Sequence, residues 1–343
     1  MTANTAFALH TLADQPPSTG AVQSTKPLLD EGTLGWPATD RHGQARLLNI
    51  GYRLHGNANG PLRVALGGIS ASRQVQCWWR AQYGQGRALD PDRALILSID
   101  WLDHPTGIST NDQADALARV LDHLDLAVVD DLIGASYGAM VGLAFAQRHS
   151  YRLRRLIAIS GAHRSQPATQ ALRQIQRAVI KLGEAAGDPK RGVHWARALA
   201  LTTYRPAALF DQRFDDVDPC VAGQSLESYL DHQGRTFSND MSAARYCCLS
   251  ESLDQHSVIP ELIRCPVELI GVDSDRLVPL EQLRDLQSRL PGHARLHVLK
   301  SAFGHDAFLK EHSALASIFQ SLFNDLSFND LPREFSRQEI ANV

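Results

Sequence analysis

Serine, aspartate and histidine residues that could together perform acyl chemistry stand in three separate stretches of this 343-residue chain. Ser136 lies in a G-x-S-x-G string, Asp273 and Asp275 follow late in the chain, and His305 comes after both in a G-H-D string. Serine is a weak nucleophile at neutral pH, so it needs a base, and a carboxylate must hold that base in the right tautomer. The order Ser, Asp, His supplies each kind of group, with two candidates for the acid.

The residues around Ser136 predict a strand, a sharp turn and a helix. A β-rich run ends at Ile133, and a small-residue helical pattern follows Gly138 at once. Such a turn holds the serine in a strained backbone conformation, so the residues two before and two after it must lack bulk. Gly134 and Gly138 meet that need, which favours the nucleophile elbow of α/β-hydrolase folds over a chance match in a glycine-containing loop. The backbone N–H of Tyr137 would then face a developing oxyanion.

Elsewhere the sequence alternates between buried strands and amphipathic helices. Strands are predicted at 48–55, 63–66, 94–100 and 156–160 and again at 266–272 and 295–299, with helices at 112–126 and 312–323. We expect the ordered part of the chain to begin near Leu47. The alternation predicts an α/β fold with a mostly parallel sheet and helices on both faces.

The segment 161–262 breaks this alternation, because it is helical in pattern and lacks a convincing buried strand. A helical block between two sheet strands is typical of a cap above the carboxyl edge, where ligands bind. The predicted organisation is a flexible arm at 1–27, an α/β-hydrolase core at 28–160 and 263–325, a helical cap insertion at 161–262 and a peripheral tail at 326–343.

Two assignments stay open on the residues alone. The loop Gly67-Gly68-Ile69-Ser70 follows a predicted strand, and its backbone around Ile69 could give the second oxyanion donor, although a plain glycine turn fits as well. Either Asp273 or Asp275 could orient His305, and Asp273 could instead cap the helix that Pro279 opens. Further histidines, including His104, His163 and His194, have no such setting, and we expect them to be solvated or locally hydrogen-bonded.

Composition excludes several classes of partner. The net charge is −3 and no basic run stands out, which argues against nucleic acid and anionic membranes. Five cysteines without C-x-x-C spacing indicate reduced thiols. The first residues show neither a signal peptide nor an apolar run that could span a membrane, so we expect a cytoplasmic protein.

Five longer strings resemble the homoserine O-acyltransferases of methionine biosynthesis, and they run from the elbow to near residue 310. They are G-A-S-Y-G-A-M at 134–140, A-R-A-L-A-L-T-T-Y-R at 196–205, E-S-Y-L-D-H-Q-G at 227–234, D-S-D-R-L-V-P at 273–279 and F-G-H-D-A-F-L at 303–309. The E-S-Y-L-x-x-Q-G and G-H-D-A-F-L strings are the most specific of these.

The resemblance implies roles for individual residues. Ser136 would be acylated by acyl-CoA, His305 would be the base, and Asp275 would be its acid. Asp306 would hold the amino group of L-homoserine, and Arg205 would hold its carboxylate. The family needs no metal or cofactor beyond acyl-CoA as co-substrate, reacts by ping-pong transfer and is commonly dimeric, so a homodimer is expected.

The sequence departs from the family near the acyl group. Ala135, Tyr137 and Ala139 replace residues usual in the elbow, the loop after the third strand reads G-G-I-S-A-S-R, and the chain is shorter between Trp79 and the elbow. The family as a whole favours an acetyl donor, and a succinyl donor stays open. Arg73 could meet a succinyl carboxylate, or it could simply be solvated.

Three alternatives to this function remain. A serine O-acyltransferase differs only in its acceptor, which is shorter by one methylene group. A serine hydrolase acting on an ester or thioester shares the catalytic residues but lacks the amino-acid clamp. A member of the fold that only binds a small ligand would not need Ser136, Asp275 and His305 together.

Overall fold

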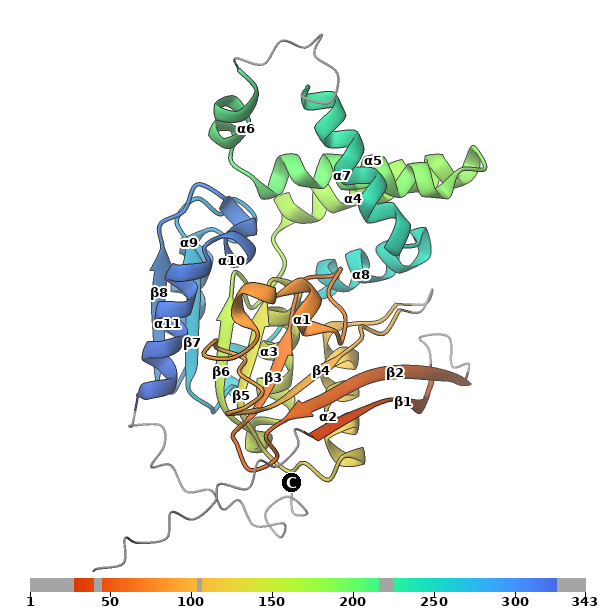
Figure 1. Cartoon of the computed structure of the whole chain (residues 1–343). Coiled ribbons are helices and arrows are strands. Elements are labelled where there is room, and N and C mark those ends of the chain that lie inside the picture. The colour runs from red at the N-terminus through yellow and green to blue at the C-terminus, as the bar shows by residue number, and fades with distance from the viewer. Residues whose placement is uncertain (1–27, 40–44, 104–106, 216–224, 326–343) are drawn as a thin grey trace, which may run out of the picture.

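The computed structural model describes residues 28–39, 45–103, 107–215 and 225–325 (Figure 1). The predicted arm at 1–27 and the predicted tail at 326–343 lie outside the described residues, as do His104 and Cys220. No helix in the described ranges is long and apolar enough to cross a membrane.

Within these ranges, eight strands form one mixed sheet in the order β1-β2-β4-β3-β5-β6-β7-β8. The strands are β1 Leu28–Thr39, β2 Ala45–Gly56, β3 Leu62–Leu66, β4 Leu95–Ile99, β5 Val129–Ala135, β6 Leu153–Ile159, β7 Val267–Val272 and β8 Ala294–Leu299. Strand β2 pairs antiparallel with β1 and β4, and all strand pairs from β4 to β8 are parallel. The predicted α/β fold with a mostly parallel sheet is therefore confirmed.

The prediction that order begins near Leu47 is wrong. Strand β1 pairs with β2 along its whole length, from Leu28 opposite Gly56 to Thr39 opposite Ala45. Its sequence, L-L-D-E-G-T-L-G-W-P-A-T, contains acidic residues, glycines and a proline, which are poor strand formers. Pro37 is tolerated because β1 is an edge strand, where an absent N–H need not break the sheet ladder. Pairing with β2 outweighs the weak local propensity.

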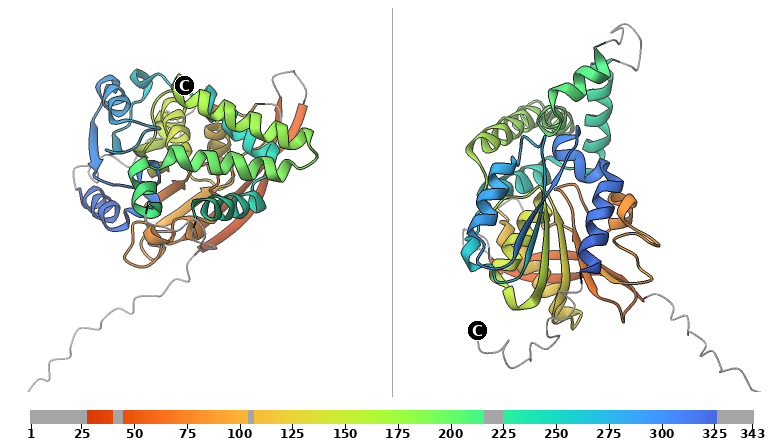
Figure 2. Two further views of the ribbon diagram at one scale, coloured as in Figure 1. Left: turned by 90° about the horizontal axis from the view of Figure 1, so that it is seen from above. Right: turned by 90° about the vertical axis from the view of Figure 1, so that its left-hand side faces the viewer.

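Helices cover both faces of the sheet (Figure 2). Alternating residues of one strand enter two separate cores, so Leu132 packs toward α2 and α3 while Ile133 packs toward α11. The helices outside the cap are α1 Val75–Trp78, α2 Thr110–His123, α3 Tyr137–Arg148, α9 Leu280–Arg289, α10 Ala307–Lys310 and α11 His312–Asn324, with short 3₁₀ turns η1 Arg80–Gln82, η2 Ser150–Arg152, η3 Pro260–Leu262 and η4 Gly304–Asp306.

Among the described residues, five α-helices lie between β6 and β7 in the chain, and Figure 1 shows them above the carboxyl edge of the sheet. They are α4 Pro167–Ala185, α5 Pro189–Tyr204, α6 Ala207–Phe214, α7 Leu226–Asp240 and α8 Ala243–Gln255. Ile180, Val193, Met241 and Tyr246 form a small buried core among them. This helical cap therefore has its own packing and stands over the end of β5, where Ser136 follows.

Candidate active site

Ser136 occupies the turn between β5 and α3 with φ 55° and ψ −114°, a conformation that an L-residue adopts only under strain. The turn is tight because strand and helix nearly touch. A Cβ at Gly134 would lie 2.3 Å from the Gly138 carbonyl oxygen, and one at Gly138 would lie 2.3 Å from the Leu66 carbonyl oxygen. Only glycine fits at either position, and the turn leaves the Ser136 side chain at the foot of a cavity beneath the cap.

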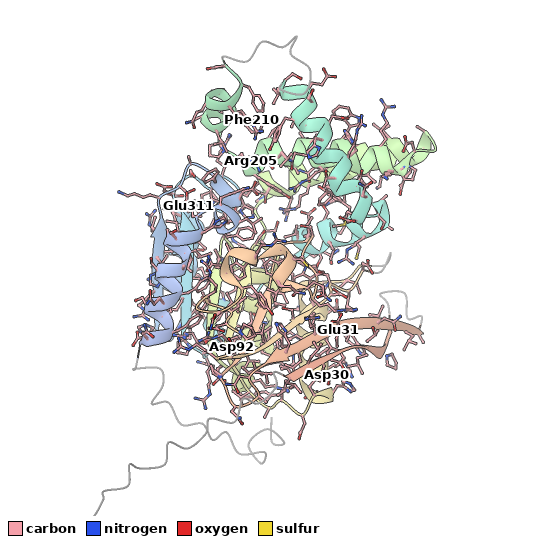
Figure 3. The ribbon with its side chains drawn as sticks, in the orientation of Figure 1. Asp30, Glu31, Asp92, Arg205, Phe210 and Glu311 are labelled. Carbon is pink, nitrogen blue, oxygen red and sulfur yellow. The ribbon has the colours of Figure 1, made fainter. Side chains whose placement is uncertain are left out.

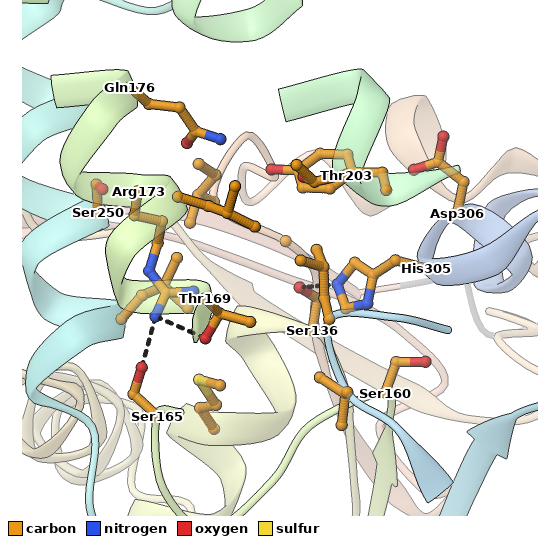
Figure 4. A pocket seen from close by; sticks show the side chains of 18 of the residues that line it. Ser136, Ser160, Ser165, Thr169, Arg173, Gln176, Thr203, Ser250, His305 and Asp306 are labelled. Atoms are coloured by element: carbon orange, nitrogen blue, oxygen red, sulfur yellow. Dashed lines mark hydrogen bonds between the residues drawn. The ribbon is translucent and has the colours of Figure 1, made fainter. Parts of the chain in front are cut away.

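Hydrogen bonds join Ser136 to His305, as Figure 4 shows, and His305 to Asp275. The Ser136 Oγ lies 2.7 Å from His305 Nε2, and His305 Nδ1 lies 2.7 Å from Asp275 Oδ2. The second oxygen of Asp275 accepts the backbone N–H groups of Leu277 and Val278 at 2.9 and 3.0 Å. These bonds fix the carboxylate, which in turn fixes the orientation of the imidazole ring.

Asp273 has a different role in the structure. Its Oδ1 accepts the backbone N–H of Ser301 at 3.0 Å, and helix α9 begins after Pro279 without a side-chain cap. The expectation that Asp273 caps this helix is therefore wrong. Of the two aspartates left open by the residues alone, it is Asp275 that contacts His305.

The environment of His305 changes its proton affinity. Burial disfavours the charged imidazolium, but the Asp275 carboxylate beside Nδ1 outweighs this effect, with Asp306 adding to it. The pKa of His305 is therefore raised above its ordinary value of about 6.5. The ring is a stronger base than a free imidazole, which suits removal of the Ser136 proton.

Two backbone N–H groups near Ser136 are free to receive an oxyanion. In the part of the chain that the structure describes, no acceptor faces the N–H of Tyr137 or that of Ile69. Ile69 and Ser136 line the same cavity. The Gly138 N–H donates to the Gly67 carbonyl at 2.9 Å, which ties the elbow to the glycine loop. The geometry thus brings both predicted oxyanion residues to one site.

Trp101 holds the peptide that carries the Ile69 N–H. The carbonyl of Gly68 accepts the Trp101 indole N–H and the Ala71 N–H, each at 2.9 Å. In a trans peptide the C=O and the following N–H point in opposite directions. The two bonds to the Gly68 carbonyl therefore fix the direction of the Ile69 N–H. The Trp101 ring also packs edge-on against Tyr137, with 4.9 Å between ring centroids.

The cavity over Ser136 has a volume of about 120 Å³ and is lined by residues of the core and the cap. One end is cationic, because Arg173 and Arg177 both pair with the single carboxylate of Asp254, each at 2.6 Å. Arg173 also donates to Ser165 and Thr169, as Figure 4 shows. This end of the cavity therefore carries more positive than negative charge.

Arg205 contacts Asp306, the other residue of the clamp that the resemblance implies. It lies between α5 and α6 (Figure 3), and its Nε donates to Asp306 Oδ2 at 2.9 Å while a second nitrogen donates to Tyr229. Asp306 lines the cavity over Ser136, whereas Arg205 lines a different cavity beside α6. The two residues of the predicted clamp are thus bound to each other, and Arg205 does not line the cavity over Ser136.

Arg197 is a cation of this cavity that the sequence reasoning did not single out. It lines the cavity over Ser136, and its guanidinium lies 5.4 Å from the ring centroid of Tyr204 and 4.8 Å from that of Phe237. Among the described residues no carboxylate pairs with it. The sequence contains a pattern that could have identified Arg197. Arg197 and Tyr204 are seven residues apart in the A-R-A-L-A-L-T-T-Y-R string, so they lie on one helix face.

The structure also bears on three smaller expectations. Arg73 neither contacts the cavity nor stands free in solvent, because it pairs with Glu31 at 3.0 Å and with Asp100 at 2.9 Å. His163 and His194 are buried, and His163 Nε2 lies 3.2 Å from Arg289 Nη1, which agrees with the expected hydrogen bonding and not with solvation. The described cysteines Cys77, Cys247, Cys248 and Cys265 are in no disulfide bond, and Cys248 and Cys265 are buried.

Comparison with known proteins agrees with this geometry. Residues 54–312 match the family described as the alpha/beta hydrolase fold. The chain is 38% identical to homoserine O-succinyltransferase from Xanthomonas campestris pv. campestris, over 88% of this chain and 85% of that protein. The chain belongs to the homoserine O-acyltransferase family. It is also 31% identical to homoserine O-acetyltransferase from Thermus thermophilus, over 71% of each chain.

The fold extends beyond this acyltransferase family. The structure of esterase E22 superposes with a TM-score of 0.75 at 17% identity, covering 87% of this chain and all of that one. The overall fold therefore does not distinguish a homoserine O-acyltransferase from an esterase. That distinction depends on the residues that line the cavity.

The raised pKa of His305 predicts the pH dependence of Ser136 reactivity. The base must be neutral, so kcat/KM for p-nitrophenyl acetate should fall as pH decreases through the His305 pKa, at a pH above 6.5. Because Asp275 raises this pKa, Asp275→Asn should move the acid limb to lower pH and lower the plateau by a factor on the order of 10⁴. An acid limb that stays in place in the variant would show that Asp275 does not act on His305.

The Trp101 contact predicts a loss of catalysis without a loss of fold. Trp101→Phe keeps the aromatic ring but removes the donor to Gly68, so the Ile69 N–H is no longer held. Removal of a whole oxyanion donor costs 10²–10³ in kcat, so a loosened donor should cost about tenfold. The KM and the thermal midpoint should change little.

The matched control is Trp78→Phe, because the Trp78 indole donates to Ser72 in the same loop but not to the peptide of Ile69. A boronic acid inhibitor, which forms a tetrahedral adduct on Ser136, should bind Trp101→Phe about tenfold more weakly and Trp78→Phe unchanged. Equal losses in the two variants would assign Trp101 a purely structural role.

Proposed function

We propose that this protein transfers an acyl group from acyl-CoA to the hydroxyl of L-homoserine, a step of methionine biosynthesis. The observation that carries the proposal is the unbroken contact from Ser136 through His305 to Asp275, at the foot of a small cavity that also contains an acidic and a basic side chain. The membership of the homoserine O-acyltransferase family supports it. No metal or further cofactor takes part in the proposed reaction.

The first half-reaction forms an acyl-serine. His305 Nε2 takes the proton of Ser136 as Oγ attacks the thioester carbonyl carbon. The N–H groups of Tyr137 and Ile69 stabilise the negative charge that develops on the carbonyl oxygen. The tetrahedral intermediate then breaks its C–S bond, and the coenzyme A sulfur leaves with the proton from His305. The products of this step are the acyl ester of Ser136 and free coenzyme A.

The second half-reaction uses the same groups in the reverse order. The hydroxyl of homoserine gives its proton to His305 and attacks the ester carbonyl, and Ser136 recovers a proton as the product ester leaves. Homoserine is zwitterionic, so a poorly solvated pocket must offer it one cation and one anion. Asp306 lines the cavity next to His305 and suits the amino group, and Arg197 suits the carboxylate.

In this arrangement Arg205 is a positioning residue. Its ion pair with Asp306 involves side chains that are 16% and 12% exposed, and Tyr229 accepts a further bond from it. Both contacts hold Asp306 at the edge of the cavity. The proposed clamp is therefore Arg197 with Asp306, in place of the pair Arg205 with Asp306 that the resemblance implies.

The donor is best assigned as succinyl-CoA, although the sequence resemblance favours acetyl-CoA. The identity is 38% with the succinyltransferase and 31% with the acetyltransferase. A succinyl group ends in a carboxylate, which an acetyl group lacks. The end of the cavity at Arg173, where two arginines share Asp254, offers positive charge to such a group. Both observations favour the dicarboxylic donor.

Hydrolysis of the acyl-serine is the alternative that the shared fold with esterase E22 keeps open. The acidic and basic side chains that line the cavity support transfer over hydrolysis, because they suit an amino-acid acceptor and water needs neither of them. L-serine as the acceptor is a second alternative, since one methylene group is worth only about 1–3 kcal/mol in a fitted pocket. A homodimer and a cytoplasmic location remain predictions.

Steady-state kinetics test the donor and the acceptor together. Succinyl-CoA and acetyl-CoA are crossed with L-homoserine, L-serine and water as acceptors, and coenzyme A release is followed. We expect the highest kcat/KM with succinyl-CoA and homoserine, and coenzyme A release that depends on the acceptor. Acetyl-CoA as the better donor would overturn the donor assignment. Rapid release of coenzyme A that homoserine does not stimulate would make the protein a thioesterase.

Substitution of the two arginines distinguishes the residue that binds the homoserine carboxylate from the residue that only positions Asp306. Arg197→Gln should raise the KM for homoserine by at least tenfold, because a buried carboxylate loses its cation. The burst of coenzyme A in the first half-reaction should persist. Arg205→Gln should have a smaller effect on KM, because Asp306 keeps its charge and loses only its fixed position. The reverse order of effects would return the carboxylate to Arg205.

A further inference from the structure

A second cavity adjoins the one over Ser136. Its volume is about 770 Å³, and it lies between strand β2, the loop after β3 and helix α7. The two cavities share two lining residues, Ser70 and Arg197. Ser70 follows the oxyanion residue Ile69, and Arg197 is the cation proposed for the acceptor. The second cavity therefore adjoins the site of the proposed reaction at Ser70 and Arg197.

The proposed reaction needs space that the first cavity does not have. Pockets for drug-sized ligands occupy about 300–1,000 Å³, and coenzyme A is larger than most drugs. A cavity of about 120 Å³ is too small to hold the coenzyme A arm as well. In ping-pong transfer the departing sulfur and the incoming hydroxyl use the same base from the same side of the carbonyl. The coenzyme A arm must therefore leave past the acceptor position, which Arg197 marks.

We propose that the cavity between β2 and α7 holds the pantetheine arm of acyl-CoA, an inference that rests on the proposed function. The arm would run from Ser136 past Ser70 and Arg197 toward the outer end of this cavity. Arg197 would then serve both half-reactions in turn, first beside the pantetheine amide and afterwards against the acceptor carboxylate.

The lining of the cavity matches the chemistry of pantetheine, which is uncharged and carries two amides, a hydroxyl and two methyl groups. Asn49, Gln233 and Thr236 offer side-chain donors and acceptors, and Trp101, Phe237 and Met241 offer apolar surface. Its other arginines are already paired, Arg73 with Asp100 at 2.9 Å and Arg245 with Asp103 at 2.7 Å. Such a balanced lining suits a neutral chain and places the nucleotide phosphates outside it.

A third cavity offers a rival route. It has a volume of about 860 Å³ and lies beside α6, lined by Arg205, Arg213 and Lys310 among other residues. It shares no lining residue with the cavity over Ser136. The ion pair between Arg205 and Asp306 stands between the two. The observations therefore favour the cavity between β2 and α7 as the path of the arm.

Helix α7 carries a matched pair of positions for a test. Thr236 lines the proposed cavity, and His232, one helical turn earlier, lines the rival one; both side chains are exposed. The variants Thr236→Trp and His232→Trp each fill one cavity. For each variant, kcat/KM is measured with succinyl-CoA and with the succinyl thioester of N-acetylcysteamine, which lacks the nucleotide and most of the arm. Homoserine is the acceptor in both assays.

We expect Thr236→Trp to lower the ratio of kcat/KM for succinyl-CoA to that for the short thioester by at least tenfold, and His232→Trp to leave the ratio within about twofold of wild type. An unchanged ratio in Thr236→Trp, or a fall in His232→Trp, would overturn the proposal. If Thr236→Trp does not fold, Thr236→Cys is labelled after folding with a bulky methanethiosulfonate, with labelled wild type as the control for Cys77. Wild type that transfers from neither succinyl-CoA nor acetyl-CoA would refute the proposed function instead.

Discussion

The hydrogen bond from the Gly138 N–H to the Gly67 carbonyl sets the spacing on which the active site depends. It joins the first turn of α3 to the loop after β3, so it fixes the Tyr137 and Ile69 N–H groups relative to one another. This approach is possible only because Gly138 lacks a Cβ, which would lie 2.3 Å from the Leu66 carbonyl oxygen. The parallel pairing of β3 with β5 brings the two segments together at the same sheet edge.

The strain at Ser136 is compensated by the bonds around it. A positive φ in a residue with a side chain costs on the order of 1–3 kcal/mol. The Ser136 N–H donates to the Ile159 carbonyl at 2.8 Å, and its own carbonyl accepts from Ala139 and Met140. The central strands β5 and β6 are buried almost throughout, so the turn cannot relax without loss of packing. Rigid strands on both sides therefore keep the nucleophile exposed to the cavity.

Sequence reasoning worked where the signal is local and failed where it depends on distant contacts. The elbow could be predicted because its glycines, its strand and its helix are contiguous, and the order of Ser136, Asp275 and His305 along the chain follows from the fold. Strand β1 could not, because its stability comes from pairing with β2 and not from its own composition. Asp273 and Asp275 are two residues apart, and only the position of His305 shows which of them reaches the ring.

The sequence reasoning chose Arg205 and not Arg197 for the same reason. Both residues stand in one ten-residue string at the end of α5. Pro206 ends the helix directly after Arg205, which turns that side chain toward Tyr229 and Asp306, whereas Arg197 remains on the helix face above Ser136. The composition of the string does not reveal this difference in direction.

The cap also determines where the base stands. The Tyr204 carbonyl, at the end of α5, lies so close to Gly304 that a Cβ there would be 2.4 Å from the oxygen, and Gly304 itself has φ 58°. His305 follows directly, and Asp306 is bound to Arg205 from the cap. A cap helix thus contacts the loop that presents the base and the proposed amino-group ligand. Since esterase E22 shares the overall fold, the groups that would distinguish transfer from hydrolysis are those at this junction, where Arg197 from the cap and Asp306 line the same cavity as Ser136.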